Sequence, residues 1–119
     1  RIARALAQEP FALALDEPTA SLDLRHEMSI FRLLRSSADQ GMTVLLITHH
    51  LNLAARFADR ILLLLRGSVA AEGSVREVLK EEILERVYRW PVAVREDSVS
   101  GSLQVTPLQA PAASSTRVR

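Results

Sequence analysis

The sequence contains no cysteine, so it can form neither a disulfide framework nor a thiolate metal site. No apolar run is longer than residues 61–65, which is far short of the roughly 20 residues that a membrane-spanning helix needs. Neither sign of charge dominates, and the formal net charge of +1 gives no electrostatic case for binding nucleic acid. The 119 residues are enough for one small domain, and 48% hydrophobic residues can supply a packed core.

What the sequence does have is a continuous apolar run at residues 11–15, followed directly by Asp16, Glu17 and Pro18. An apolar run that does not alternate with polar residues predicts a strand buried on both faces, as in a parallel sheet. The two carboxylates then lie at the carboxyl end of the strand. In open α/β sheets, ligands bind at that edge.

Asp16 and Glu17 are expected to have different tasks, because neighbouring residues on a strand point to opposite sides. One carboxylate suits a hard cation such as Mg²⁺, which prefers carboxylates, waters and phosphate oxygens. The other suits the polarisation of an attacking water molecule. The plainer alternative is that Asp-Glu-Pro only marks the end of a strand and a turn.

A helix is predicted at residues 24–39, between Asp23 as its N-cap and Gly41 as the residue that ends it. Its apolar residues recur every three to four positions, which predicts one buried stripe. The stripe comprises Leu24, Met28, Phe31, Leu34 and Ala38.

A second strand is predicted at residues 43–48, again apolar at its centre. Two parallel strands joined by a helix form a right-handed βαβ unit, so His49 and His50 follow the second strand at the same edge as the two carboxylates. A histidine in such a place is more often an ordinary surface or core residue. Two adjacent histidines also suggest a metal site, but we recognise no third or fourth ligand, and His26 falls on the helix.

The remaining residues are predicted to form a hairpin, short helices and a small extension. The hairpin turn is Arg66-Gly67, where glycine supplies a positive φ, and Ser74 with Glu77 forms a capping box. Helices are expected at 51–57, 75–80 and 81–89, and strands at 61–65, 68–71, 92–95 and 103–106. The fold class is therefore α/β, a parallel sheet with flanking helices plus a C-terminal hairpin and a small extension.

The residues that carry a family resemblance begin with LALDEPTASLD, which resembles the Walker B segment and D-loop of ATP-binding cassette (ABC) ATPases. TVLLITH resembles the strand that carries the switch histidine of that family, and DRILLLLRG with VAAEG resembles the strand pair that follows. The similarity keeps the order and spacing of the family. It implies a partial P-loop NTPase-like fold, with the C-terminal part of the ATPase domain at 1–80, an extension at 81–106 and a disordered tail at 107–119.

By this resemblance, Asp16 supports Mg²⁺ through a water molecule, and Glu17 is the catalytic carboxylate for the water that attacks the γ-phosphate of ATP. His49 is the switch histidine, which contacts the γ-phosphate. His50 stands where the family usually has aspartate, and we assign it no catalytic role. ATP and Mg²⁺ are the implied cofactors.

The resemblance also implies partners and a location. Ser21 and Asp23 match the D-loop, which reaches across a dimer to the nucleotide site of a second ATP-binding subunit, here expected to form a homodimer. Simple N-capping by Asp23 is the alternative. Transmembrane permease subunits and, indirectly, a substrate-binding protein belong to such an importer, whose ATP-binding subunit is cytoplasmic and peripheral on the inner face of the membrane. No nucleic acid is expected as a partner.

Residues 23–26, 87–92 and 104–107 resemble the importer subfamily for iron-siderophores, haem and cobalamin. The alternative is that Trp90 and Val92 only pack an extension onto the core. The Walker A loop, Q-loop and signature motif do not occur in the sequence, so we expect it to be the C-terminal part of a longer ATP hydrolase. Two other hypotheses stay open: a soluble ABC-type ATPase of DNA repair or the ribosome, and a fragment that is inactive alone because it lacks the phosphate-binding loop.

Overall fold

The computed structural model describes residues 12–109 of the chain. The helix end expected at residues 1–8, Phe11 of the first expected strand and residues 110–119 of the expected tail lie outside the described residues. The chain divides into two compact units, Arg1–His50 and Leu51–Arg119, which we call the first and the second unit.

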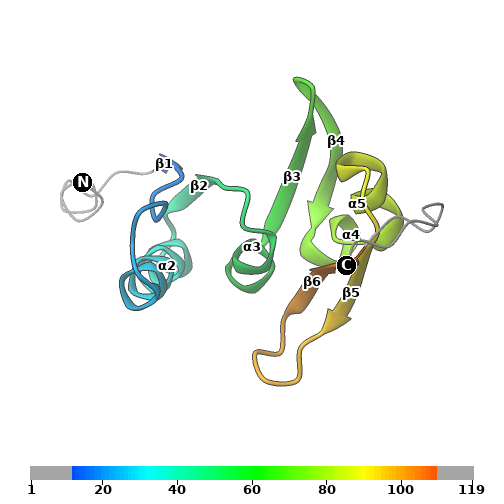
Figure 1. Cartoon of the computed structure of the whole chain (residues 1–119). Helices are drawn as coiled ribbons and strands as arrows, with labels where there is room; N and C mark the ends of the chain where they lie inside the picture. Colours follow the sequence, from blue (N-terminus) through cyan, green and yellow to red (C-terminus); the bar gives the residue numbers. More distant parts are fainter. Residues whose placement is uncertain (1–11, 110–119) are drawn as a thin grey trace. The chain divides into compact units, whose positions relative to one another are not determined.

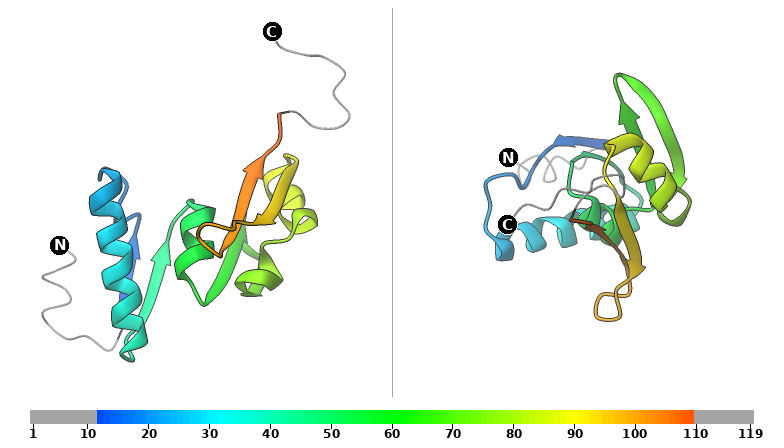
Figure 2. Two further views of the ribbon diagram at one scale, coloured as in Figure 1. Left: turned by 90° about the horizontal axis from the view of Figure 1, so that it is seen from below. Right: turned by 45° about the vertical axis from the view of Figure 1, so that its right-hand side comes forward.

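Two parallel strands joined by a helix make up the described part of the first unit (Figure 1). β1 (Ala12–Asp16) pairs with β2 (Thr43–Ile47), with Asp16 opposite Ile47 at the end of the ladder. α2 (Leu24–Asp39) connects the strands and runs beside them (Figure 2). The predicted βαβ arrangement and the α/β fold class are confirmed, so the carboxyl ends of both strands meet at one edge.

α2 begins and ends where its capping residues predict. The Asp23 side chain accepts a hydrogen bond of 3.0 Å from the backbone N–H of His26, which satisfies one of the unpaired donors in the first turn. Gly41 follows the C-cap with a φ of 105°, a conformation that residues with a side chain rarely adopt.

α2 packs through the middle of its apolar stripe. Phe31 and Leu34 are 2% and 4% exposed, and they are the buried residues of this helix. The expectation that Leu24 belongs to the stripe is wrong, because its side chain is 73% exposed. Leu24 is the first residue of the helix, and only the later turns bury their apolar side chains.

The expectation that both strands are buried on two faces is also wrong for this chain. Along β1 and β2, half-buried residues alternate with exposed ones, and Leu45 and Ile47 are 57% and 55% exposed. A continuous apolar run suits a strand that is covered by a layer on each side. Among the residues that the structure describes, only one side of the strand pair is covered.

The second unit has a hairpin, three short helices and a further antiparallel strand pair around one core (Figure 1). Its elements are α3 (Leu51–Phe57), β3 (Arg60–Leu65), β4 (Ser68–Ser74), α4 (Val75–Val78), α5 (Glu81–Tyr88), β5 (Val92–Glu96) and β6 (Leu103–Pro107). The buried core residues are Ala55, Ile61, Leu63, Val78, Leu79, Leu84, Val87, Val92 and Val105. α4 and α5 end slightly before the predicted positions, because Leu79 leaves helical geometry and Arg89 takes a left-handed conformation.

β3 and β4 form the predicted hairpin. Its two turn residues, Arg66 and Gly67, both have positive φ angles of 52° and 78°, the geometry that matches the twist of paired strands. The sequence predicts this conformation at the glycine, and the structure adds it at Arg66. The capping box is confirmed: the Ser74 N–H donates to Glu77 Oε1, and the Glu77 N–H donates to Ser74 Oγ.

The extension is fixed to the core rather than loosely attached. Val92 is 7% exposed and belongs to the buried core, in agreement with the plain packing alternative for this residue. Trp90 Nε1 donates to the Leu108 carbonyl oxygen at 2.7 Å, and the Leu108 N–H donates to the Pro91 carbonyl oxygen at 2.9 Å. Hydrogen-bonded structure therefore continues past residue 107, where the tail is expected to begin. The boundary between 80 and 81 stays a prediction.

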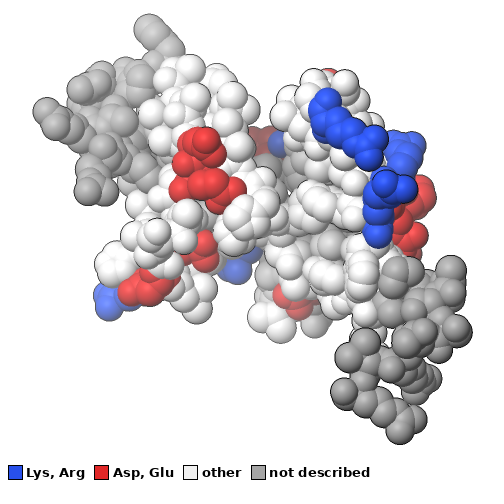
Figure 3. Space-filling model, turned by 45° about the horizontal axis from the view of Figure 1, so that its top comes forward, with Lys and Arg blue, Asp and Glu red and all other residues white. Residues whose placement is uncertain are grey.

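On the face shown in Figure 3, blue and red groups lie in several patches, in one of which they adjoin, and uncharged areas separate the patches. None of the helices within residues 12–109 is long and apolar enough to cross a membrane.

Candidate functional site

Glu17 stands at the turn that ends β1. Its backbone N–H donates to the Ile47 carbonyl oxygen at 2.9 Å, which extends the parallel ladder by one more bond. Its φ is 47°, in the left-handed region that a residue with a side chain enters only at a cost. The turn directs this carboxylate away from the strand direction and towards the residues that follow β2.

The Glu17 carboxylate binds His49, 32 positions later in the sequence, through two contacts. The backbone N–H of His49 donates to Glu17 Oε1 at 3.1 Å, and the ring Nδ1 of His49 lies 2.7 Å from the same oxygen. The hydrogen bond from the His49 side chain lowers the pKa of Glu17, and partial burial opposes this effect. The parallel pairing of β1 with β2 therefore brings together the two residues that the sequence predicts to be catalytic.

His50 completes a cluster with these two residues. Its ring lies against that of His49, with centroids 4.3 Å apart, and its backbone N–H donates to Thr48 Oγ1 at 3.1 Å. One ligand atom each of Glu17, His49 and His50 lie within 4.8 Å of one another. The sequence pattern indicates no third metal ligand beside the two histidines, and the structure supplies one in Glu17.

Asp16 lies outside this cluster, at the last position of β1 and on the exposed side of the strand pair. The prediction that Asp16 and Glu17 point in different directions agrees with this arrangement. The Asp16 carboxylate is an oxygen donor of the kind that Mg²⁺ prefers, directly or through water, so its chemistry and exposure fit the predicted role.

The loop between β1 and α2 is held by Thr19, a residue to which no sequence motif assigns a role. Thr19 is 4% exposed, and its hydroxyl donates to Glu27 Oε2 at 3.1 Å. Two successive turns, closed by the N–H groups of Ala20 and Leu22, shape the loop around it. A buried threonine inside an exposed polar loop leaves no periodic signal in the sequence.

The predicted D-loop residues lie on this same loop. Asp23 accepts hydrogen bonds from the backbone N–H of His26, and the His26 Nδ1 lies 2.8 Å from Asp23 Oδ1. These hydrogen bonds, the backbone one first, lower the pKa of Asp23. Ser21 is exposed. N-capping by Asp23 is thus observed, and its role across a dimer stays a prediction.

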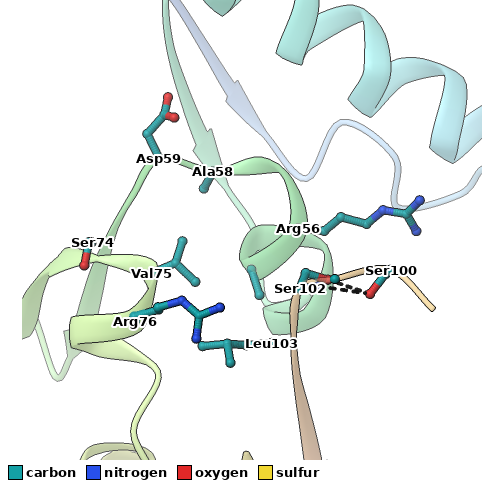
Figure 4. Close-up of a pocket in the computed structure, with 11 residues that line it drawn as sticks. Arg56, Ala58, Asp59, Ser74, Val75, Arg76, Ser100, Ser102 and Leu103 are labelled. Carbon is teal, nitrogen blue, oxygen red and sulfur yellow. Dashed lines mark hydrogen bonds between the residues drawn. The ribbon is translucent and has the colours of Figure 1, made fainter. Parts of the chain in front are cut away.

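A hollow of about 450 Å³ opens in the second unit (Figure 4). Its lining includes Arg76, which pairs with Glu96, and the hydroxyls of Ser100 and Ser102, which lie 2.8 Å apart and bond to each other. These polar groups are satisfied by the protein itself, and none of the sequence-predicted site residues lines the hollow. We assign it no ligand.

The sequence is similar to hemin import ATP-binding proteins. It is 51% identical over 106 residues to the one of Rhodococcus jostii, a match that covers 89% of this chain and 36% of that protein. The identity is 44% with the Nocardia farcinica protein and 46% with the Streptomyces coelicolor protein, covering 38% and 39% of their lengths. The chain thus spans little more than a third of the length of these relatives. No protein-family model matches it.

Solved structures of ABC proteins have the same fold over most of the chain. A metal-chelate type ABC transporter in an inward-facing conformation matches with a TM-score of 0.77 and 32% identity, over 91% of this chain and 44% of that one. A dimeric ATP-binding cassette in a post-hydrolysis state, bound to ADP and Pi, matches with a TM-score of 0.57 and 41% identity, over 63% of this chain and 32% of that one.

We predict that replacement of His49 by alanine raises the pKa of Glu17 towards the ordinary value of a glutamate. The reason is that the His49 hydrogen bonds stabilise the ionised carboxylate. Because the pKa of Glu17 is lowered in the folded state, this interaction stabilises the fold above the ordinary glutamate pKa and is lost as the pH falls through the lowered one. A pH titration of the Glu17 side-chain carboxyl carbon by NMR measures the change.

The matched control for this titration is His26→Ala, which removes a histidine that binds Asp23 instead. It is expected to leave the Glu17 pKa unchanged. An equal Glu17 pKa in the protein and in His49→Ala contradicts the geometry of the site.

Proposed function

The chain shares the sequence and the fold of part of the ATP-binding proteins of ABC transporters, and from this premise we propose that the whole protein hydrolyses ATP to drive import across a membrane. The observation that carries the proposal is the contact of Glu17 with His49 at the carboxyl ends of two parallel strands. Ligands of open α/β sheets bind at that edge. Hydrolysis of a phosphoanhydride needs little covalent chemistry there, because positioning and charge stabilisation supply most of the catalysis.

In the proposed reaction, the Glu17 carboxylate accepts a hydrogen bond from the attacking water and orients its oxygen towards the γ-phosphorus. The lowered pKa keeps this carboxylate ionised and able to accept that bond. We propose that His49, which is exposed beside it, donates through Nε2 to an oxygen of the γ-phosphate. With Nδ1–H directed at the Glu17 carboxylate, this role needs a ring that carries protons on both nitrogens. The bond between the γ-phosphorus and the oxygen that bridges to the β-phosphate breaks as the bond to the water oxygen forms, the Glu17 carboxylate accepts the proton of the water, and ADP and inorganic phosphate leave.

Asp16 is the residue that we propose to hold Mg²⁺ through a water molecule. Its exposed carboxylate next to Glu17 fits such a cation. When bound, the cation supplies positive charge that balances the phosphate oxygens. Asp16 itself then keeps the metal-bound water in place.

The proposed partners follow from the same relationship. One structure neighbour is a dimeric ATP-binding cassette, and another is an ABC transporter in an inward-facing conformation. We propose that Ser21 and Asp23 face the second ATP-binding subunit of a homodimer, and that permease subunits bind the protein at the cytoplasmic face of the membrane. Capping of α2 by Asp23 fixes the loop in which both residues lie, which suits a contact surface.

Hemin is the substrate class that we propose for the transporter. Its support is that similar proteins of Rhodococcus jostii, Nocardia farcinica and Streptomyces coelicolor, with 44–51% identity, carry the name hemin import ATP-binding protein. The metal-chelate type of the first structural match agrees with such a cargo. A role in DNA repair or at the ribosome has no comparable support.

Replacement of Glu17 by glutamine in the whole protein is expected to keep ATP binding and to slow hydrolysis by about 100-fold or more, the range for loss of a group that assists proton transfer. The amide keeps the size of the side chain but loses the charge that orients the water. Steady-state phosphate release measures turnover, and equilibrium binding of a fluorescent ATP analogue measures affinity. Glu72→Gln, at an exposed glutamate of β4, is the matched control. Unchanged hydrolysis in Glu17→Gln removes this residue from the mechanism.

Deletion of the gene for the whole protein is expected to abolish growth on hemin as the iron source, while uptake of iron-siderophores and cobalamin stays normal. Complementation with the intact gene restores growth, and complementation with the Glu17→Gln variant does not. Growth on each source and uptake of labelled hemin measure the effect. Loss of siderophore or cobalamin uptake instead of hemin uptake contradicts the proposed substrate, but not the proposed hydrolysis.

A further inference from the structure

We propose that Glu17, His49 and His50 bind a transition-metal dication such as Zn²⁺. This site goes beyond the proposed ATPase function and does not depend on it. One ligand atom from each of the three residues lies within 4.8 Å of the others, around the edge where β1 and β2 end. A carboxylate with two imidazoles is a common set of three protein ligands for zinc in sites that keep a further position open.

Hydrogen bonds of the backbone N–H groups hold the main chain at all three proposed ligands. Glu17 is anchored by its N–H bond to the Ile47 carbonyl oxygen of the ladder. The N–H of His49 donates to the Glu17 carboxylate, and the N–H of His50 donates to the Thr48 hydroxyl. These backbone bonds do not use the ring nitrogens, but His49 Nδ1 already lies 2.7 Å from Glu17 Oε1 and has to exchange that contact for a metal if it is to be a ligand.

The distances require only side-chain rotation. Ligand atoms around a tetrahedral zinc ion, at bond lengths of about 2.1 Å, are about 3.4 Å apart. Glu17 Oε1 and His49 Nδ1 are closer than that, at 2.7 Å, and the cluster as a whole extends to 4.8 Å. The His49 side chain is 76% exposed and therefore has room to turn, so a metal replaces the shared proton between the carboxylate and the ring.

The ligand set also determines which metal is favoured. Imidazole nitrogens suit Zn²⁺, Cu²⁺, Ni²⁺ and Co²⁺, whereas Mg²⁺ prefers oxygen ligands alone. With three protein ligands and an exposed histidine, solvent completes the coordination. His50 supplies the third ligand, because the Glu17–His49 pair alone supplies only two.

One consequence concerns the ATPase and rests on the proposed function. A zinc ion at the site occupies the carboxylate that orients water and the histidine that contacts phosphate. Zn²⁺ is therefore expected to inhibit hydrolysis, and substitution of His50 is expected to relieve that inhibition.

The test is zinc binding by the whole, nucleotide-free protein, measured by competition with a chromophoric zinc chelator. The protein is expected to bind one zinc ion at this site in the micromolar range or tighter. His50→Ala and His50→Asn, each checked for native circular dichroism, are expected to weaken binding at this site by more than about 10-fold, because loss of a direct ligand costs at least as much as loss of a group that only orients a ligand. The visible absorption of bound Co²⁺ is expected to change in both variants.

His26→Ala is the matched control, since it removes the one histidine of the sequence that lies outside the proposed site. His26 lies on α2 and contacts Asp23, the N-cap of that helix. This variant is expected to leave zinc affinity unchanged. Equal zinc affinity in the protein and both His50 variants overturns the proposal, as does the absence of binding at micromolar zinc. Because no arm requires ATP hydrolysis, failure here is distinct from failure of the proposed function.

Discussion

The parallel pairing of β1 with β2 is the constraint on which the rest of the site depends. It places Asp16 opposite Ile47, so that the residues which follow the two strands, Glu17 and His49, meet at one edge. At the turn, Glu17 adopts a left-handed backbone conformation, and its carboxylate lies within hydrogen-bonding distance of His49. The strand ladder offsets this local cost, since it holds both ends of the contact.

Much of the local structure is predictable because it is encoded by short-range signals. Capping of α2 by Asp23, the capping box at Ser74 and the turn around Gly67 all follow from residue types at fixed spacings. Family resemblance adds that Glu17 and His49 belong to one site, and their contact in the structure agrees with it. Such predictions need no knowledge of long-range packing.

What the sequence does not reveal depends on tertiary placement. The left-handed conformation of Glu17 and the burial of Thr19 arise from how the loop closes, and neither has a periodic pattern. His50 gains a third metal ligand beside it only when the two strands pair. The exposed Leu45 shows a second limit of sequence patterns. An apolar run indicates that its residues can be buried, but it does not indicate whether this chain supplies the layer that would cover them.

The central claim is that the Glu17–His49 edge receives the terminal phosphate of ATP, and the most direct measurement is a crystal structure of the whole protein with Mg²⁺ and a non-hydrolysable ATP analogue. The account predicts that His49 lies within hydrogen-bonding distance of the γ-phosphate, with the Glu17 carboxylate facing a water molecule in line with the bond to be broken. A γ-phosphate bound away from both residues, with Glu17 and His49 still in contact with each other, contradicts it.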